Sequence, residues 1–181
     1  SHNIKDYKLE NLRMHIGNVP QNAFLFSESI EDNIRLGKQS ATEDEIIQAS
    51  KKAVIHQNII KFKQGYKTLL GERGLTLSGG QIQRVSIARA LIKDPQILLF
   101  DDCLSAVDTD TEEKILKNIK DFTQNKTTLI VSHRISSVKD ADRIIVLDRG
   151  KIIEEGMHQE LIDLKGFYFD LFNKQNNEKE F

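Results

Sequence analysis

Apolar residues gather in three short runs in the second half of the chain, at positions 97–100, 128–131 and 143–147. Each run is four or five residues long and rich in Ile, Leu and Val, a composition typical of parallel strands that are covered on both faces. Segments with helical spacing, 110–122 and 134–138, lie between the runs. This alternation of strands and helices predicts an α/β layer architecture.

The third run is expected to lead into a hairpin, because the Asp-Arg-Gly-Lys sequence at 148–151 predicts a tight turn into a strand at 152–155. The region 22–94 has a different pattern, with amphipathic helical segments at 42–53 and 81–92 and no convincing strand between them. We therefore expect a mostly helical insertion into an α/β core. The last segment, 166–181, begins as a helix and ends in a polar tail.

Composition narrows the class of protein. The 181 residues suit one medium domain, with or without a subdomain. The 26 Lys and Arg residues nearly balance the 27 Asp and Glu residues, which argues against a nucleic-acid binder that relies on bulk charge. The single cysteine, Cys103, excludes an internal disulfide and fits a reducing compartment. The longest apolar runs are too short to predict a transmembrane helix.

The stretch LTLSGGQIQR, residues 75–84, is the first candidate site. Ser78 and Gln81 have the spacing of a capping box, which makes Ser78 the N-cap of a helix over 79–92. Gly79 and Gly80 leave the backbone N–H groups of the first turn open to close approach. The positive end of a helix attracts phosphate, so this is either an anion site or an ordinary capped helix with a glycine turn. The stretch alone favours neither.

The strand ILLFD ends in the second candidate site, formed by Asp101 and Asp102. Open α/β sheets place ligand contacts at the carboxyl ends of their strands. Asp101 suits a Mg²⁺ site, because hard cations bound to phosphates take carboxylate oxygens, and Asp102 could polarise an attacking water. The alternative, that two acids simply begin a loop, is weak because the preceding apolar run would bury the surroundings of the first acid.

Two weaker candidates are His133 and Gln21. The strand TTLIV leads into Ser132 and His133, which would place an imidazole near the same sheet edge, where it could bond a γ-phosphate. A lone histidine is more often structural. Gln21 follows a proline, and on its own it cannot be distinguished from an ordinary polar residue of a loop.

The order and spacing of these pieces resemble the nucleotide-binding domain of ABC transporters, over nearly the whole chain and including GMHQEL at 156–161. The matching motifs are the Q-loop at Gln21, the signature motif at 77–81, the Walker B strand at 97–101, the D-loop at 105–108 and the switch histidine at His133. The segments 18–34 and 68–74 resemble the exporter branch of the family. The second of them is similar to a loop that contacts the membrane domain in exporters.

The resemblance implies a P-loop NTPase fold, with an ABC-type ATPase core that is truncated at its N-terminus and carries an inserted α-helical subdomain. Residues 1–21 would be the end of the core sheet and the Q-loop, and residues 22–94 the helical subdomain with the signature motif. Residues 95–181 would be the RecA-like core with Walker B, the D-loop, the switch histidine and the C-terminal helices.

The resemblance also implies ATP and Mg²⁺ as cofactors and assigns the site residues. The residues concerned are Asp102 and His133 for catalysis, Asp101 and Gln21 for the metal, and Ser78, Gly79, Gly80, Gln81, Gln21 and Asp108 for the nucleotide. The implied partners are a second nucleotide-binding domain in a head-to-tail dimer and the transmembrane domains of the same transporter, with no nucleic acid. The implied location is the cytoplasmic face of the cell (inner) membrane.

The first departure of the sequence from the family pattern is the absence of a phosphate-binding loop motif. A phosphate-cradling loop needs G-x-x-x-x-G-K-[ST], and this motif occurs nowhere in the 181 residues. We therefore expect that the chain starts after the Walker A helix and that it binds ATP poorly and is inactive alone. Exposed sheet edges would make association or aggregation plausible.

The second departure is Asp102, where the family usually has glutamate. Aspartate is one methylene shorter, and a misplacement of about 1 Å can cost on the order of a hundredfold in rate. This resembles the degenerate site in one half of heterodimeric multidrug- and lipid-type exporters, although such sites often lose the histidine that is kept here, and some homodimeric relatives could tolerate aspartate. The implied function is the ATP-hydrolysing domain of an ABC exporter. The alternatives are a soluble, non-transport ABC-type ATPase and a non-catalytic partner module.

Overall fold

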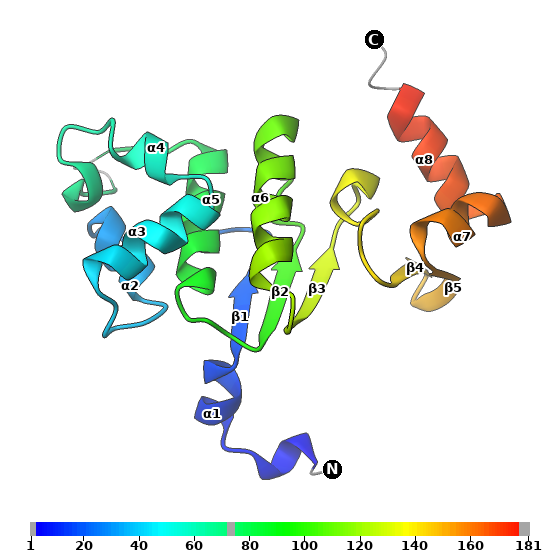
Figure 1. Ribbon diagram of the computed structural model, residues 1–181, viewed down its shortest axis with the longest axis horizontal. Helices are drawn as coiled ribbons and strands as arrows, with labels where there is room; N and C mark the ends of the chain where they lie inside the picture. The colour runs from blue at the N-terminus through cyan, green and yellow to red at the C-terminus, as the bar shows by residue number, and fades with distance from the viewer. Residues whose placement is uncertain (1–2, 72–74, 178–181) are drawn as a thin grey trace. The chain divides into compact units, whose positions relative to one another are not determined.

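The computed structural model describes residues 3–71 and 75–177, which divide into two compact units, one up to Val131 and one from Ser132 onward (Figure 1). The first unit contains η1 (Ile4–Asp6), α1 (Leu9–Met14), β1 (Ile16–Val19), α2 (Ile30–Arg35), α3 (Glu43–Lys52), α4 (His56–Ile59), η2 (Gly65–Lys67), α5 (Gly79–Leu91), β2 (Ile97–Asp101), α6 (Thr109–Phe122) and β3 (Thr127–Val131). The second unit contains η3 (Ile135–Ser137), β4 (Ile144–Asp148), β5 (Lys151–Gly156), α7 (His158–Leu164) and α8 (Phe167–Asn177).

The first unit is built on a parallel sheet with the strand order β1-β2-β3. Val19 pairs with Phe100, and Asp101 pairs with Val131, so the three strands end at one edge of the sheet. This confirms the α/β architecture and the strands predicted at 97–100 and 128–131. It also places the segments that follow β1 and β2 beside each other.

The sheet is covered on one face rather than on both. Leu98 and Phe100 of β2 join Ile87 of α5 and Ile115 of α6 in one core. The opposite face carries exposed apolar side chains, among them Leu129, which is 56% exposed. The prediction that these apolar runs are buried on both faces is therefore wrong, because the helices of the described first unit pack against only one side of β2 and β3.

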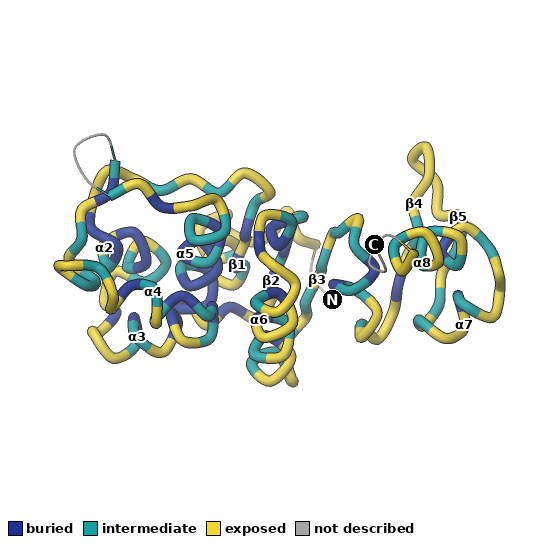
Figure 2. Tube along the Cα trace, turned by 90° about the horizontal axis from the view of Figure 1, so that it is seen from above, coloured by how far each residue is buried: buried dark blue, intermediate teal, exposed yellow. Residues whose placement is uncertain are grey.

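Helix α5 is the centre of the first unit. It packs against α2, α3 and β1, and Figure 2 shows the buried positions gathered around these helices. The helix predicted at 79–92 is confirmed, but its pattern is less one-sided than an amphipathic surface helix, since residues on several sides of it are buried. The buried residues are Gln83, Val85, Ser86, Ile87, Ala88, Ala90 and Leu91.

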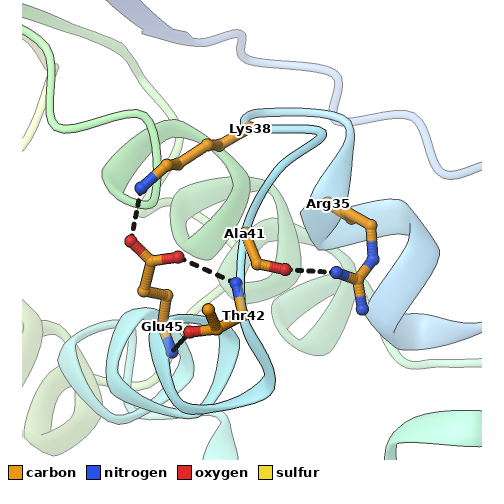
Figure 3. Close-up of polar contacts among 5 residues, drawn as sticks. All are labelled: Arg35, Lys38, Ala41, Thr42 and Glu45. Atoms are coloured by element: carbon orange, nitrogen blue, oxygen red, sulfur yellow. Dashed lines mark hydrogen bonds and ion pairs between the residues drawn. The ribbon is translucent and has the colours of Figure 1, made fainter.

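The corner between α2 and α3 shows why α3 begins where the sequence predicts (Figure 3). The Thr42 hydroxyl accepts a hydrogen bond from the Glu45 backbone N–H at 3.2 Å, and the Glu45 carboxylate accepts one from the Thr42 N–H at 2.8 Å. Lys38 pairs with Glu45, and these contacts lower the pKa of the Glu45 carboxyl, the Lys38 hydrogen bond most. Arg35 donates to the Ala41 carbonyl and closes the turn.

The second unit confirms the predicted hairpin. β4 and β5 pair antiparallel around a turn in which Arg149 has a φ of 46° and Gly150 a φ of 74°. Positive φ at both central residues is the requirement of a type I′ turn. The segment 143–147 was expected among the parallel strands, and this is wrong: β4 pairs with β5 in a separate two-stranded sheet.

The segment 134–138, predicted as helical, forms only the short 3-10 helix η3, because five residues allow little more than one turn. The rest of the second unit is held by the buried Tyr168, whose hydroxyl bonds His158 Nδ1 at 2.8 Å, and by Glu154, which accepts from the first backbone N–H groups of α8. Among the described helices of both units, none has the length and apolar composition needed to cross a bilayer.

Candidate functional site

The carboxyl edge of the parallel sheet brings together three of the residues predicted from the sequence. β2 ends at Asp101 and Asp102 follows directly, while Gln21 comes two residues after the end of β1. Gln21 Nε2 donates a hydrogen bond to Asp102 Oδ2 at 3.3 Å, which joins side chains 81 residues apart in the sequence. The expected grouping of Gln21, Asp101 and Asp102 at one sheet edge is therefore present in the fold.

The backbone holds Asp102 in an uncommon conformation. Its φ is 41°, in the left-handed region that aspartate and asparagine tolerate better than most residues. Its N–H donates to the Val131 carbonyl at 2.8 Å, and its own carbonyl accepts from the Ser105 hydroxyl at 3.0 Å. These contacts from two segments fix the turn that carries the second acid.

The oxygen atoms at this edge suit a hard divalent cation. The carboxylates of Asp101 and Asp102 and the amide oxygen of Gln21 are ligands of the kind that Mg²⁺ prefers. Within residues 3–71 and 75–177, no group of three or more His, Cys, Asp and Glu side chains is arranged to hold a metal. Mg²⁺ is usually bound through one or two carboxylates together with the phosphates of a nucleotide.

The second candidate site, at the start of α5, has the predicted cap. The Gln81 backbone N–H donates to the Ser78 hydroxyl at 3.4 Å, and Gln81 Oε1 accepts from the Ser78 N–H at 2.9 Å. The capping box is confirmed, and α5 begins at Gly79. The first two residues at the positive end of α5 are therefore glycines, Gly79 and Gly80, which have no side chains.

The segment 105–108 lies directly against this end of α5. A Cβ added to Gly80 would stand 2.8 Å from the carbonyl oxygen of Ala106, whereas one added to Gly79 would stand 3.7 Å from the Ala106 Cβ. Two of the motifs in the predicted series, LSGGQ and SAVD, are thus in contact within one chain. Gly80 is required for this approach, and Gly79 is not.

Asp108 caps the next helix. Its Oδ1 accepts from the Thr111 N–H at 3.0 Å, at the start of α6. The pKa of the Asp108 carboxyl lies below its usual value, chiefly because of the Thr111 backbone N–H and, to a smaller degree, because of the Arg84 guanidinium. Asp108 therefore stays ionised and fixes the end of the segment that contacts Gly80.

His133 belongs to the second unit, whereas the other predicted site residues belong to the first. Its backbone carbonyl accepts from Gln175 Nε2 at 2.7 Å, and the same glutamine accepts from the Ile135 N–H at 2.9 Å. The placement of its imidazole near Asp102 stays a prediction. Glu72 and Arg73, in the segment expected to resemble an exporter loop, lie outside the described residues.

Comparison with known proteins decides the family. The sequence model described as ABC transporter matches residues 1–105. The chain belongs to the ABC transporter family. This confirms the assignment made from the order of the motifs.

Individual relatives of this ABC transporter chain are similar over nearly its full length. It is 47% identical over 177 residues to ATP-binding cassette sub-family B member 6 of Xenopus tropicalis, covering 98% of the chain and 21% of that protein. It is 46% identical over 176 residues to the mitochondrial iron-sulfur clusters transporter ABCB7 of Oryzias latipes, covering 97% of the chain and 24% of that protein. The chain spans about a quarter of the length of these curated relatives.

A solved structure gives the same fold. A bacterial Atm1-family ABC exporter with ATP bound matches with a TM-score of 0.91 and 43% identity, covering 96% of the chain and 30% of that protein. The predicted ABC-type ATPase fold is confirmed by this match.

Sequence reasoning missed several polar residues of α5 and α2 that bind the main chain of neighbouring segments. Gln83 donates to the Gln21 carbonyl at 3.3 Å, and Arg89 donates to the Phe24 carbonyl at 3.0 Å and to Asn33. Arg84 donates to the Val54 carbonyl at 2.7 Å. The available signal was the presence of glutamine and arginine inside a helix whose other residues are mostly buried.

Cys103, next to the two acids, should be chemically inert in the folded protein. The side chain is 1% exposed, and burial raises the pKa of its thiol from 9.0 to about 12. We expect iodoacetamide at pH 8 to label it about a thousandfold more slowly in the native protein than in urea, because the thiolate is the reactive form and about three pKa units separate the two states. Mass spectrometry of the Cys103 peptide measures this, and equal rates would contradict the burial.

The same thiol contributes to the pH dependence of stability. An unfolded chain ionises it near pH 9.0 and the folded chain only at about 12. The contribution is therefore fully present below pH 9 and is lost as the pH rises from 9 towards 12.

Proposed function

We propose that this chain is part of the ATP-hydrolysing, nucleotide-binding domain of an ABC exporter, whose full-length form we call the parent protein. The observation that carries the proposal is the contact between Gln21 and Asp102 at the carboxyl edge of the parallel sheet. It joins the expected Q-loop to the residue after Walker B, in a chain that belongs to the ABC transporter family. The resemblance of 96% of this chain to 30% of an exporter of known structure supports it.

Within the site, Asp101 and the amide oxygen of Gln21 would hold Mg²⁺. Bound Mg²⁺ supplies charge neutralisation for the phosphates of ATP. Asp102 would orient the attacking water and accept its proton, while the Gln21 N–H₂ group keeps the Asp102 carboxylate in place. His133 would donate to the γ-phosphate. Positioning and electrostatics would supply most of the rate enhancement.

The start of α5 would serve a second nucleotide-binding domain in a head-to-tail dimer. Ser78, Gly79, Gly80 and Gln81 would present backbone N–H groups and the positive helix end to the phosphates of the partner's ATP. Asp108 would contribute to the same interface through the segment that it fixes against Gly80. The capped and intact start of α5 supports this role.

The parent protein would carry transmembrane domains and act at the cytoplasmic face of the inner membrane, where ATP hydrolysis would drive export. Two of its relatives are named as a transporter and an exporter. The aromatic side chains of Phe24 and Phe26, exposed by 65% and 49% beside the Q-loop, offer a surface for contact with those domains.

Aspartate at position 102 supports a second candidate within this function, a weakly catalytic half of a heterodimer. In that arrangement the chain keeps a working signature motif for its partner's site, while its own site turns over slowly. The short side chain of Asp102 is the observation that favours it.

The test is ATP hydrolysis by the parent protein, purified with its membrane domains in lipid vesicles. We expect turnover that depends on Mg²⁺ and is abolished by EDTA. The 181-residue chain, which has no phosphate-loop motif, should stay at the background rate in the same assay. Turnover by the isolated chain at the rate of the parent protein, or turnover of the parent without Mg²⁺, would contradict the proposal.

A further inference from the structure

The loop formed by residues 21–26, which we call the 21–26 loop, connects β1 to the turn before α2 without regular secondary structure. Two of its carbonyl groups accept hydrogen bonds from side chains of α5. Gln83 Nε2 donates to the Gln21 carbonyl at 3.3 Å, and Arg89 Nη1 donates to the Phe24 carbonyl at 3.0 Å. The helix that begins at the signature motif therefore holds the loop that carries Gln21.

A third anchor comes from Asn33, which is completely buried. Its Oδ1 accepts from the Phe26 N–H at 2.8 Å, and its Nδ2 donates to the Phe26 carbonyl at 3.0 Å. Arg89 binds the same residue, through Nε to the Asn33 carbonyl at 2.8 Å and through Nη2 to Oδ1 at 3.0 Å. The planar guanidinium thus ties α2, α5 and the 21–26 loop together with three hydrogen bonds of fixed direction.

These polar contacts restrain the loop together with Leu25, which is partly buried and packs against the core, whereas the two aromatic side chains of the loop are exposed. Phe24 and Phe26 lie edge to face with ring centres 5.0 Å apart, and both are exposed. Apolar burial of these two rings therefore contributes little to holding the loop.

The burial of Gln83 indicates that its side-chain amide has a specific hydrogen-bonding role and does not merely fill space in the core. The residue is 6% exposed, and its Oε1 has no hydrogen-bond partner among the described residues. A buried polar oxygen without a partner is costly, so a glutamine at this position needs a compensating contact. Its Nε2 donates to the Gln21 carbonyl, and this hydrogen bond joins the buried amide to the loop.

From these contacts we infer that Gln83 and Arg89 are positioning residues, which hold the 21–26 loop so that the Gln21 amide faces Asp102. The inference rests on the proposed ATPase function. The connection runs from α5 through the Gln21 main chain to Gln21 Nε2, and from there over 3.3 Å to Asp102 Oδ2. A shift of α5 at the signature end would then move Gln21 relative to the acid.

The first experiment compares lysine variants of two arginines in the parent protein. Arg89→Lys keeps the charge and removes the fork geometry, so we expect kcat for Mg²⁺-ATP to fall about tenfold with KM changed less than twofold. Arg35→Lys is the matched control, because Arg35 also donates to a loop carbonyl, that of Ala41, outside the 21–26 loop (Figure 3). We expect it to keep kcat, and an equal fall in both variants would overturn the inference.

The second experiment separates positioning from a loss of stability. Gln83→Leu removes the amide at similar volume, and Gln21→Ala removes the group that Gln83 is inferred to position. If Gln83 acts through Gln21, Gln83→Leu lowers kcat in the wild type but has no further effect in the Gln21→Ala background. Independent, multiplicative effects would overturn the inference.

The outcomes also distinguish this inference from the proposed function. A wild-type parent protein without Mg²⁺-dependent hydrolysis would overturn the proposed function and this inference with it. A wild-type protein that hydrolyses ATP, with variants of Gln83 and Arg89 that keep its kcat, would overturn only the positioning role.

Discussion

Replacing Asp102 by glutamate in the parent protein, assembled with its partner domain, should raise ATP hydrolysis at this site by about a hundredfold. The carboxylate of Asp102 lies at the carboxyl edge of the sheet, where its Oδ2 accepts from Gln21 Nε2 at 3.3 Å. Glutamate would carry the carboxylate about 1.5 Å further from the backbone. That added reach is the distance that the shorter residue lacks for orienting a water at the γ-phosphate.

The backbone conformation at position 102 makes the glutamate variant slightly less stable than the wild type. Asp102 has a φ of 41°, and glutamate tolerates the left-handed region less well than aspartate, at a cost of about 1 kcal/mol of stability. This affects the folded state as a whole and leaves the direction of the rate change unaltered. The Asp102 N–H donates to the Val131 carbonyl and the Asp102 carbonyl accepts from the Ser105 hydroxyl, and the substitution retains both bonds because they use main-chain atoms of residue 102.

The measurement is single-site turnover of Mg²⁺-ATP, with the partner's own site inactivated. Asp102→Asn is the matched control, because it keeps the length and removes the charge, and we expect it to fall to background. A glutamate variant that is no faster than the wild type would contradict the interpretation of Asp102 as a degenerate catalytic residue. Equal rates for the wild type and Asp102→Asn would show that the aspartate contributes nothing to hydrolysis.

Local features of the fold could be predicted from the sequence because each depends on residues close together in the chain. The capping box at Ser78 involves residues three apart, and the hairpin turn depends on Arg149 and Gly150 alone. The acids after β2 could be placed at the sheet edge because an apolar run identifies a strand and its end. These contacts need no knowledge of the tertiary structure.

The coverage of the sheet could not be predicted, because a run of Ile, Leu and Val has the same composition whether one face or both are buried. Leu98 is buried and Leu129 is exposed, although both occur in similar apolar runs. The difference is made by α5 and α6, which pack on one side. Similarly, the pattern of 143–147 indicates a strand but does not indicate which strand pairs with it. In the structure its partner is β5.

The anchors of the 21–26 loop were missed for a related reason. Gln83 and Arg89 bond to main-chain carbonyls, and every residue has a carbonyl, so no side-chain pattern marks the acceptors. The predicted site residues were those with side chains that act on a ligand. The residues that hold them depend on how α5 packs, which the sequence pattern alone does not specify.

Replacing Gly80 by alanine should destabilise the start of α5 by about 1–3 kcal/mol. The added Cβ would stand 2.8 Å from the Ala106 carbonyl oxygen, a distance at which the backbone of the 105–108 segment must move. Ala106 is part of a turn held by the Ser105 hydroxyl and by the Val107 N–H bond to Leu104, so the movement breaks local contacts. Alanine is a better helix former than glycine by up to about 1 kcal/mol, and this offsets only part of the cost.

Gly79→Ala is the matched control for this steric effect. Its Cβ would meet only the Ala106 Cβ at 3.7 Å, an ordinary contact, so we expect unchanged or slightly higher stability. Hydrogen exchange of the parent protein, followed by mass spectrometry, measures both variants. Peptides covering 78–91 and 101–108 should exchange about tenfold to a hundredfold faster in Gly80→Ala and at the wild-type rate in Gly79→Ala. If both variants exchange at the wild-type rate, the close approach of the 105–108 segment to Gly80 does not hold. If both accelerate equally, the effect arises from the loss of glycine flexibility rather than from the contact with Ala106.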